Sequence, residues 1–516
     1  MNKNTPLSFA SIDCPAVMLA IPPYRSNIHA LFPGIAFLSG SLKAAGCRVA
    51  VFDGDVASFV EEETGLGTEQ MLSEFIHLFS PTLVGVYVNT PNYKASLHLA
   101  RKIKELTDTP LVAGGPHASL AGQSILHHHL EFDAVLAGEA EQTLPELAWA
   151  IQAGVKIHDI GQYLEKILPP EKPGTGPSST VLFRHNDVLC RKSFAGPSLD
   201  KIACPDRDAL LNPPYEPLAR LARVVYGKNF FHTFPAFEGR DVITTHSSRG
   251  CFGDCSFCAP TVLNRDGVLG SPCRRLRPPE KIAEELEEAR RLGFTAWYFD
   301  EPAFPLAEPG KWGEDVCSLL ENMNAPWGCV ARFDEVLATD MEAWAKAGLR
   351  YLYVGLETPN KKLQHKLGKD VDPFLAASTS DYLYSLGIQC DFSVFFGMPG
   401  ETSESIDWSI NWLNEHFPRG NVFFSLAAFW PGTSWSFNAG LRPECWEPEC
   451  SSITTPPSHL VWYPEETPFI DRFFSNGTGT YHPSLLTIEN ALRIREKIEA
   501  SGLRRRFSTI SRRAKV

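Results

Sequence analysis

The sequence predicts an α/β protein made of two successive sets of strand–helix units. Short apolar runs alternate with helical stretches from about residue 15 to 165, and the alternation resumes near residue 240. Short apolar strands separated by helices are typical of parallel sheets that are covered on both faces. Between the two sets, residues 166–238 are rich in proline and polar residues, so we expect a linker with little regular structure.

The first set is expected to form a doubly wound sheet. Its five candidate strands are Ala16–Ile21, Arg48–Phe52, Leu83–Val88, Leu111–Ala113 and Ala134–Leu136. Helices are predicted near residues 35–45, 69–79, 94–106 and 141–153. Ligands of such sheets bind beyond the carboxyl ends of the strands. The turns that follow the strands are therefore the candidate ligand-binding segments.

The second set is expected to form six strands, five of them followed by a helix. The candidate strands are Val242–Thr245, Ala296–Phe299, Gly328–Ala331, Tyr351–Val354, Gln389–Phe395 and Val422–Ala427. Helices are predicted near residues 278–292, 312–323, 339–347, 373–386 and 402–416. In barrels of this kind the active site lies at the carboxyl ends of the strands. Within the linker, Val181–Arg184 and Val188–Arg191 are expected to form a hairpin.

Composition is that of a water-soluble protein of two or three domains. The chain has 516 residues, of which 44% are hydrophobic and 21% are charged, and its net charge is −12. A negative net charge argues against broad nucleic-acid binding. Thirteen cysteines without an apparent secretory leader or membrane-spanning run predict a reducing compartment, the cytoplasm.

Three cysteines carry the clearest chemical signal. Cys251, Cys255 and Cys258 follow the first strand of the second set with the spacing C-x3-C-x2-C. Thiolates hold iron–sulfur clusters, and three of them would leave one iron of a four-iron cluster free for another ligand. The alternatives are a zinc site or three unrelated buried cysteines. Structural zinc normally takes four protein ligands, and the sequence offers no second paired unit nearby.

The cysteine segment resembles the signature of the radical S-adenosylmethionine (radical SAM) superfamily, C-x3-C-x-aromatic-C, with Phe257 as the aromatic residue. The resemblance implies a partial six-stranded barrel whose 4Fe–4S cluster is held by Cys251, Cys255 and Cys258. It also implies that the open iron binds the amino and carboxylate groups of S-adenosylmethionine. An electron from the cluster would then cleave that cofactor to a 5'-deoxyadenosyl radical.

Motifs at the other strand ends extend this resemblance. They are Asp300-Glu301 after the second strand, Arg332, Gly355-Leu356-Glu357-Thr358, and Gly397-Met398-Pro399-Gly400-Glu401-Thr402. The family implies acids for the methionine ammonium, an arginine for its carboxylate, an acid for the ribose and a glycine-rich turn for the adenine. The residues expected to bind S-adenosylmethionine are Phe257, Asp300, Glu301, Arg332, Glu357, Gly397, Gly400 and Glu401. The pair Asp300-Glu301 departs from the usual Gly-Gly-Glu or Asp-Asp.

The turns of the first set resemble the cobalamin-binding domain that precedes many radical SAM barrels. The residues expected to bind cobalamin are Asn89, Thr90, Gly114, Gly115, Pro116, His117, Gly138 and Glu139. The family motif Asp-x-His-x-x-Gly, whose histidine binds cobalt from below, is absent, because the chain has Asp53-Gly54-Asp55 at that place. We therefore expect no histidine on the cobalt, with Asn89 as the candidate neighbour. His117 is expected to be a turn residue that forms local hydrogen bonds.

These features predict a cobalamin-binding domain at 1–165, a linker at 166–238, a radical SAM barrel at 239–435 and a small C-terminal cap at 436–516. The cap contains a predicted surface helix near 484–500 and is either a barrel-closing segment or a lid that contacts the substrate. Cysteines 445 and 450 show no spacing that demands a second cluster.

The expected function is a cobalamin-dependent radical SAM methyltransferase that acts on an unactivated carbon, less readily on phosphorus. A rearrangement, ring contraction or cyclisation without methyl transfer is the alternative within the class, and a non-catalytic cobalamin or redox sensor is the alternative outside it. The expected partners are a small-molecule or peptide substrate and an electron donor of the flavodoxin or ferredoxin type. Neither nucleic acid nor stable membrane insertion is expected.

Overall fold

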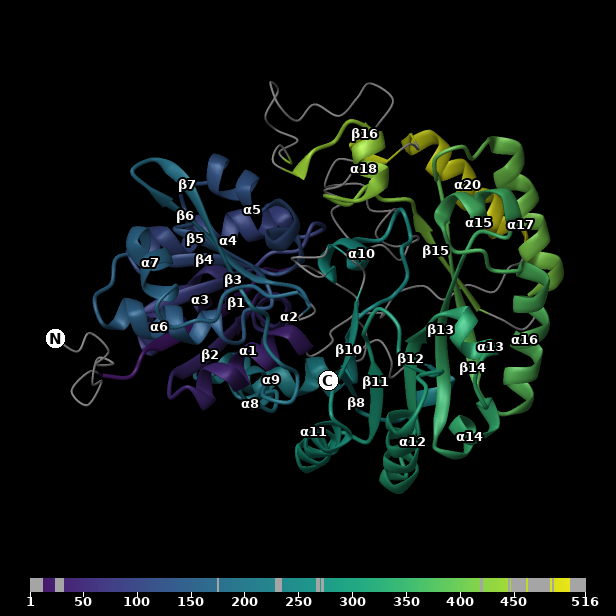
Figure 1. Cartoon of the computed structure of the whole chain (residues 1–516), viewed down its shortest axis with the longest axis horizontal. Coiled ribbons are helices and arrows are strands. Elements are labelled where there is room, and N and C mark those ends of the chain that lie inside the picture. The colour runs from purple at the N-terminus through teal and green to yellow at the C-terminus, as the bar shows by residue number, and fades with distance from the viewer. Residues whose placement is uncertain are drawn as a thin grey trace.

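The fold is α/β, with an N-terminal Rossmann-like domain and a partial barrel side by side (Figure 1). The computed structural model describes residues 13–23, 32–173, 176–227, 234–265, 270, 273–417, 421–443, 446, 461–462, 483–484 and 487–501. The two predicted sheets are both present. Among the described residues, none of the helices combines the length and apolar character needed to cross a bilayer.

The N-terminal sheet has seven strands in the order β2-β1-β3-β4-β5-β6-β7. The first five strands run parallel: β1 (Ala16–Ile21), β2 (Arg48–Asp53), β3 (Leu83–Tyr87), β4 (Leu111–Gly114) and β5 (Ala134–Gly138). Their helices are α1 (Pro33–Ala44), α2 (Gly54–Thr64), α3 (Thr68–Phe79), α4 (Tyr93–Leu106), α5 (Pro116–His128) and α6 (Thr143–Gln152). The direction in which successive strands are added to the sheet reverses between β1 and β3, and such a switch point is where open α/β sheets bind ligands.

The stretch expected to be an irregular linker contains more regular structure than the sequence suggested. The expected hairpin is present as β6 (Ser179–His185) and β7 (Val188–Phe194), and it extends the N-terminal sheet because β6 pairs antiparallel with β5. Two helices follow, α8 (Asp208–Leu211) and α9 (Glu216–Gly227).

Helix α9 is tied back to the first domain through a buried polar contact. The Tyr226 hydroxyl donates a hydrogen bond to the Asp53 carboxylate at the end of β2, and both side chains are buried. A buried carboxylate is stable only when it is hydrogen-bonded. The helix therefore packs as part of the N-terminal domain.

The second sheet is the partial barrel. Its six parallel strands follow chain order: β8 (Val242–Thr245), β11 (Ala296–Phe299), β12 (Trp327–Ala331), β13 (Leu349–Glu357), β14 (Gln389–Phe396) and β15 (Asn421–Leu426). The helices along them are α11 (Pro279–Arg291), α12 (Lys311–Met323), α13 (Phe333–Leu337), α14 (Met341–Lys346), α15 (Lys361–Leu367), α16 (Pro373–Ser385) and α17 (Ser403–His416). Within the described chain, β8 and β15 each pair on one side only, so the barrel is open.

A short antiparallel ribbon stands beside β8. Strand β9 (Ser248–Gly250) pairs with β10 (Arg274–Leu276), and the cysteine segment and α10 (Ala259–Leu263) lie between them in sequence. The ribbon thus fixes the chain that leads directly into Cys251.

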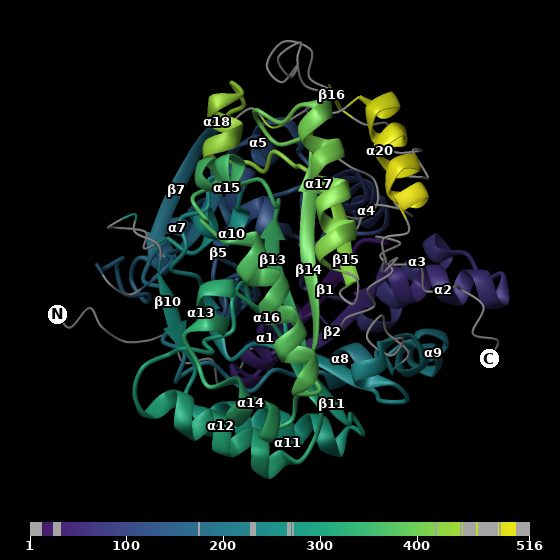
Figure 2. The same ribbon diagram turned by 90° about the vertical axis from the view of Figure 1, so that its right-hand side faces the viewer.

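The described part of the C-terminal cap comprises α18 (Ser434–Asn438), β16 (Val461–Trp462), β17 (Pro483–Ser484) and α20 (Ile488–Ser501). Helix α20 confirms the helix expected near 484–500 and lies along α17 (Figure 2). Arg493 donates to the Ser403 hydroxyl at 2.8 Å, and Lys497 pairs with Asp407. Cysteines 445 and 450, together with Tyr463, Phe473 and Phe474, lie outside the described residues.

Candidate active site

The cysteine segment is held at its start by a buried carboxylate. Glu301 accepts hydrogen bonds from the Ser247 amide at 3.0 Å and from the Ser247 hydroxyl. Burial raises the pKa of Glu301 to about 7, although the bonds from Ser247 oppose this shift. Gly250 has φ +94°, and a Cβ there would collide with the Cys273 carbonyl, so only glycine fits immediately before Cys251.

The three predicted cysteines line one cavity of about 290 Å³. The Gly253 amide donates to Sγ of Cys251 at 3.3 Å, and the Cys258 amide donates to the Cys255 carbonyl at 3.2 Å. Burial raises the pKa of the Cys258 thiol to about 12, so bound metal would be needed to keep it as a thiolate at neutral pH.

The donor set fits a multi-iron cluster better than zinc. In the part of the chain that the structure describes, no three His, Cys, Asp or Glu side chains are grouped closely enough to hold a single metal ion. An iron–sulfur cluster places each thiolate on a different iron, so its ligands stand farther apart than those of zinc. Three thiols around one cavity therefore fit a cluster with one open iron.

Two cations line the same cavity. Arg332 was predicted, and its fork is held by Asp334, with Nε–Oδ1 at 3.0 Å and Nη2–Oδ2 at 2.8 Å. Its third nitrogen, Nη1, lies against Gly253, where a Cβ would collide with it. Lys369 was not predicted from the sequence, because it lies beyond the strand-end motif, but it is buried and lines the cavity beside Glu357.

Glu357 adopts a backbone conformation that is uncommon outside glycine. Its φ is +64°, and the pairing of β13 with β14 shifts in register between Gly355 and Glu357. The carboxylate is buried, lines the cavity and forms an ion pair with Lys369. A left-handed non-glycine residue at a strand end stores backbone strain, which is a feature of functional sites.

The acidic pair after β11 divides into two roles. Glu301 is turned toward Ser247 as described above, whereas Asp300 keeps contact with solvent, although the surrounding protein desolvates its carboxyl and raises the pKa to about 7. Asp300 lies near Tyr87 of the N-terminal domain, and burial together with this carboxylate raises the pKa of that phenol. Of the two acids, Asp300 is therefore the one that lies beside the N-terminal domain.

The remaining residues predicted in the barrel lie in the cavity wall and in the turn after β14. Phe257 lines the cavity and packs against Phe395 and Trp435, with ring centroids 5.0 and 5.6 Å apart. Gly400 lines a neighbouring cavity of about 400 Å³. Glu401 accepts the Gly397 amide at 2.5 Å and so closes the turn. Burial raises the pKa of Glu401 to about 7.

In the N-terminal domain, a hydrogen bond joins the turn after β3 to the start of α5. The Asn89 side chain accepts the Thr90 amide at 2.8 Å, and Oγ1 of Thr90 lies 3.0 Å from Nδ1 of His117. His117 is fully buried and stacks on Tyr93 at 4.3 Å, and burial lowers its pKa to about 3. His117 is therefore neutral, but it lies in the first turn of α5 and not in a loop, its Nδ1 bonds to Thr90 of a distant turn, and its Nε2 is buried without a hydrogen-bond partner among the described residues.

The turn after β4 leaves room for a ligand at one of its two glycines. A Cβ on Gly114 would meet nothing closer than 3.9 Å, so free space adjoins this residue. Gly115 has φ +103°, and a Cβ added there would lie only 2.8 Å from the Val88 carbonyl oxygen, so this position has no room for a side chain. Pro116 begins α5 at the position that proline favours.

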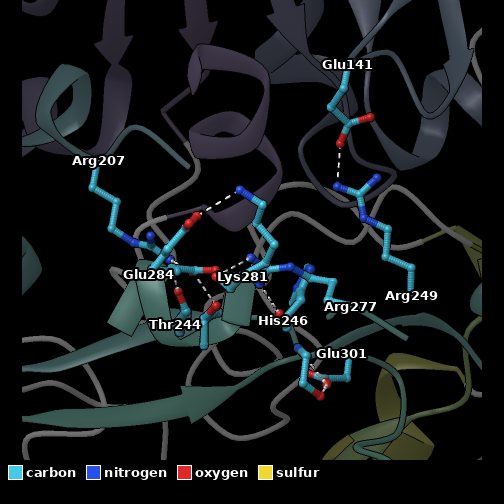
Figure 3. A network of polar contacts seen from close by, with 12 residues as sticks. Glu141, Arg207, Thr244, His246, Arg249, Arg277, Lys281, Glu284 and Glu301 are labelled. Carbon is cyan, nitrogen blue, oxygen red and sulfur yellow. Dashed lines mark hydrogen bonds and ion pairs between the residues drawn. The ribbon is translucent and has the colours of Figure 1, made fainter. Parts of the chain in front are cut away.

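The turn after β5 faces the barrel through its carboxylates. Glu139 pairs with Arg249 at 3.0 Å and with Arg275. Glu141 pairs with Arg249 as well, as Figure 3 shows. Arg249 and Arg275 are cross-strand partners in the β9–β10 ribbon. Glu139 was predicted to bind cobalamin, but its carboxylate lies on these two arginines. Gly138, with φ +82°, makes the preceding bend.

Two family models match the chain. A B12 binding domain covers residues 29–148, and the radical SAM superfamily covers residues 245–413. The first range contains β2 to β5 of the N-terminal sheet, and the second runs from the end of β8 into α17 of the partial barrel.

Individual relatives have low sequence identity to this chain but align over most of its length. An anaerobic magnesium-protoporphyrin IX monomethyl ester cyclase of Rubrivivax gelatinosus is 22% identical over 433 residues, 82% of this chain and 68% of the relative. The hopanoid C-3 methylase of Methylococcus capsulatus is 23% identical over 431 residues, 82% of this chain and 69% of the relative.

A solved structure supports the fold. The radical S-adenosylmethionine methyltransferase TsrM from Kitasatospora setae, with cobalamin and a 4Fe–4S cluster bound, superposes with a TM-score of 0.64 at 16% identity. The match covers 96% of this chain and 93% of TsrM.

Replacing Cys251, Cys255 and Cys258 together by alanine should abolish the cluster, because no other thiol described here lines the cavity. Anaerobically reconstituted protein should lose its visible absorption and most of its iron. The matched control is Cys273→Ala, which removes a neighbouring thiol outside the cavity and should retain the cluster. About four irons per chain in the triple variant would contradict the assignment.

Cobalamin bound to this chain should carry no histidine on cobalt, because His117 is buried within the domain. Electron paramagnetic resonance of the cob(II)alamin form should lack nitrogen superhyperfine splitting, and His117→Gln should leave the spectrum unchanged. A clear imidazole pattern that disappears in the variant would refute this expectation.

Proposed function

Because this chain belongs to the cobalamin-dependent radical SAM enzymes, we propose that it is a methyltransferase that acts on an unactivated carbon of a small-molecule or peptide intermediate. Phosphorus is the less favoured acceptor. The observation that carries the proposal is the convergence of three thiols, Arg332 and Glu357 on one cavity at the carboxyl end of the barrel.

The cofactors are a 4Fe–4S cluster, S-adenosylmethionine and cobalamin. Cys251, Cys255 and Cys258 would hold the cluster, and the rest of the same cavity would hold the methionine end of S-adenosylmethionine. When bound, these groups supply an electron, a 5'-deoxyadenosyl radical and a methyl group. The protein positions them and protects the reaction from water.

The charged residues of the cavity divide the work of binding S-adenosylmethionine. Asp334 fixes the guanidinium of Arg332 in place, and the guanidinium stays charged at all relevant pH values, so it is a preorganised partner for a carboxylate. Glu357 would accept hydrogen bonds from the ribose hydroxyls. Asp300 does not line the cavity itself but stands two residues before Pro302, which does, and it would bind an ammonium group there, since Glu301 is occupied by Ser247.

Much of the cavity wall is aromatic. Phe257, Phe395, Trp430 and Trp435 line it together with the small residue Ala427. Such a lining suits radical chemistry, because it keeps solvent from the reactive carbon and raises the strength of the charge interactions inside. Trp435 belongs to α18, so the beginning of the C-terminal cap contributes to the wall.

The carboxyl edge of the N-terminal sheet would hold cobalamin. The predicted residues there include Asn89, Thr90, Gly114 and Gly115, which are small and uncharged and suit a large ligand with peripheral amides. The free space beside Gly114 supports its contact with a corrin ring or its nucleotide tail.

A radical cyclisation or rearrangement without methyl transfer is the second candidate. The similarity to the cyclase of Rubrivivax gelatinosus favours it, while the methyltransferase relatives favour the first. A non-catalytic sensor is the least favoured function, since it would not need the cysteines, Arg332 and Glu357 in one cavity. The electron donor that we propose is a flavodoxin or ferredoxin, and the compartment is the cytoplasm, where thiols stay reduced.

Turnover with a substrate should yield a product heavier by one methylene unit, because methyl replaces hydrogen. S-adenosylhomocysteine and 5'-deoxyadenosine should form in about equal amounts if one S-adenosylmethionine donates the methyl group and another yields the radical. Liquid chromatography with mass spectrometry measures all three. Deoxyadenosine without methylated product or S-adenosylhomocysteine would favour the cyclase. The absence of all three compounds would favour the sensor.

Glu357→Gln should weaken S-adenosylmethionine binding by about tenfold, since hydrogen bonds to charged groups contribute roughly 1.5–3 kcal/mol. Equilibrium dialysis with the cluster-loaded protein measures this affinity, and the iron content shows whether the cluster remains. Glu335→Gln is the matched control, because Glu335 is also buried and ion-paired, with Arg274 at 2.6 Å, outside the cavity. Equal affinities in the two variants would contradict the role of Glu357.

A further inference from the structure

Arg249 lies at the contact between the two cofactor domains. It is two residues before Cys251 in the β9–β10 ribbon, and its guanidinium reaches Glu139 and Glu141 of the N-terminal domain. Figure 3 shows the Glu141 side chain descending from that domain onto Arg249. One residue therefore joins the turn after β5 to the start of the cysteine segment.

The contact is buried on every side. The side chains of Arg249, Glu139 and Glu141 are 12%, 13% and 7% exposed. The ring of Phe37, on α1 of the N-terminal domain, contacts the guanidiniums of both Arg249 and Arg277, whose central carbons lie 5.1 and 4.9 Å from the ring centroid. Charges buried in this way hold one another in place, because moving one of them leaves its partner unpaired and desolvated.

The acidic turn is itself rigid and lies at the ligand-binding edge. Strand β5 neighbours β4, so the Gly138 bend adjoins the turn of Gly114 and Gly115. The Gly138 amide donates to the Ser119 hydroxyl at 2.9 Å, and a Cβ on Gly138 would collide with the Ser178 carbonyl. A ligand that shifts this turn would therefore also shift the carboxylates of Glu139 and Glu141.

The ion-pair network also has unused hydrogen-bonding capacity. Oε2 of Glu141 and Nε of Arg275 are buried and make no hydrogen bond among the described residues. An amide N–H brought by a ligand at this edge would satisfy Oε2 of Glu141, fix the carboxylate and, through it, fix Arg249. Cobalamin carries several peripheral amides, so it has the required chemistry.

We propose that Arg249 is a positioning residue that couples the two cofactor sites, so that cobalamin at the turn after β5 and the cluster at Cys251 stabilise one another's binding. The inference rests on the cofactor set of the proposed function. It goes beyond that function, because two cofactors could bind to such domains independently.

Coupling of this kind is reciprocal. If the cluster tightens cobalamin binding by some factor, cobalamin must stabilise the cluster-bound form by the same factor. We expect the wild-type protein to bind cobalamin at least about fivefold more tightly with the cluster than without it. Cobalamin should also change the spectrum of the reduced cluster.

The test compares cobalamin dissociation constants of the full chain with and without the reconstituted cluster, measured anaerobically from the cob(II)alamin absorption. Glu141→Gln should bring the ratio of the two constants close to one. Arg249→Lys, which keeps the charge but loses the fork, should leave an intermediate ratio. Electron paramagnetic resonance of the reduced cluster, with and without cobalamin, gives the reciprocal measurement.

Glu308→Gln is the matched control. Glu308 pairs with Arg274 of the same ribbon at 2.6 Å, but both residues belong to the barrel. If the ribbon charges had a purely structural role, both glutamine variants would hold less cluster, and the ratio of the two cobalamin dissociation constants would stay as in the wild type. That result would overturn the inference. A wild-type ratio of one would also overturn it, while failure to bind cobalamin at all would overturn the proposed function as well.

Discussion

The site depends on how a glycine-containing loop of three cysteines is held before any metal arrives. Thiols cannot converge by themselves, so the chain before them must be fixed from outside. Glu301 holds Ser247 from the neighbouring strand end, the β9–β10 ribbon holds the next residues, and the acidic turn of the other domain holds Arg249. Breaking a buried pair of this kind costs about 3–5 kcal/mol, so these anchors make the loop a stable scaffold.

The open barrel and the doubly wound sheet contribute in different ways. The barrel gathers side chains of the cysteine segment and of β12, β13, β14 and β15 around one small cavity, and its charged members are held in pairs such as Arg332 with Asp334. The turns after β3 and β4 of the N-terminal sheet instead offer small neutral residues beside the neutral, buried His117, while the acids of the turn after β5 are paired with arginines of the barrel. A strongly charged pocket and a neutral platform suit an ionic cofactor and a large amide-rich one.

Sequence patterns predicted the strands, the cysteine triad and the cavity positions of Arg332 and Glu357, because apolar periodicity and strand-end motifs are local features. Long-range partners were not predictable. No local pattern indicates that Glu139 lies on Arg275, that Glu301 turns to Ser247, or that Lys369 reaches Glu357 from a later segment. Helices α2 and α5 were missed as well, because glycine-rich turn residues begin both and obscure their periodicity.

The antiparallel addition of β6 and β7 bears on the order in which the protein takes shape during synthesis. Strand β5 has its second neighbour only once residues 179–185 are available, and buried Asp53 has its phenol partner only with Tyr226. Domains fold as units as the chain emerges. The first unit therefore stays incomplete until the ribosome has passed residue 226, when the cysteine segment is about to follow. The nascent cysteines thus emerge beside a surface that has just become complete.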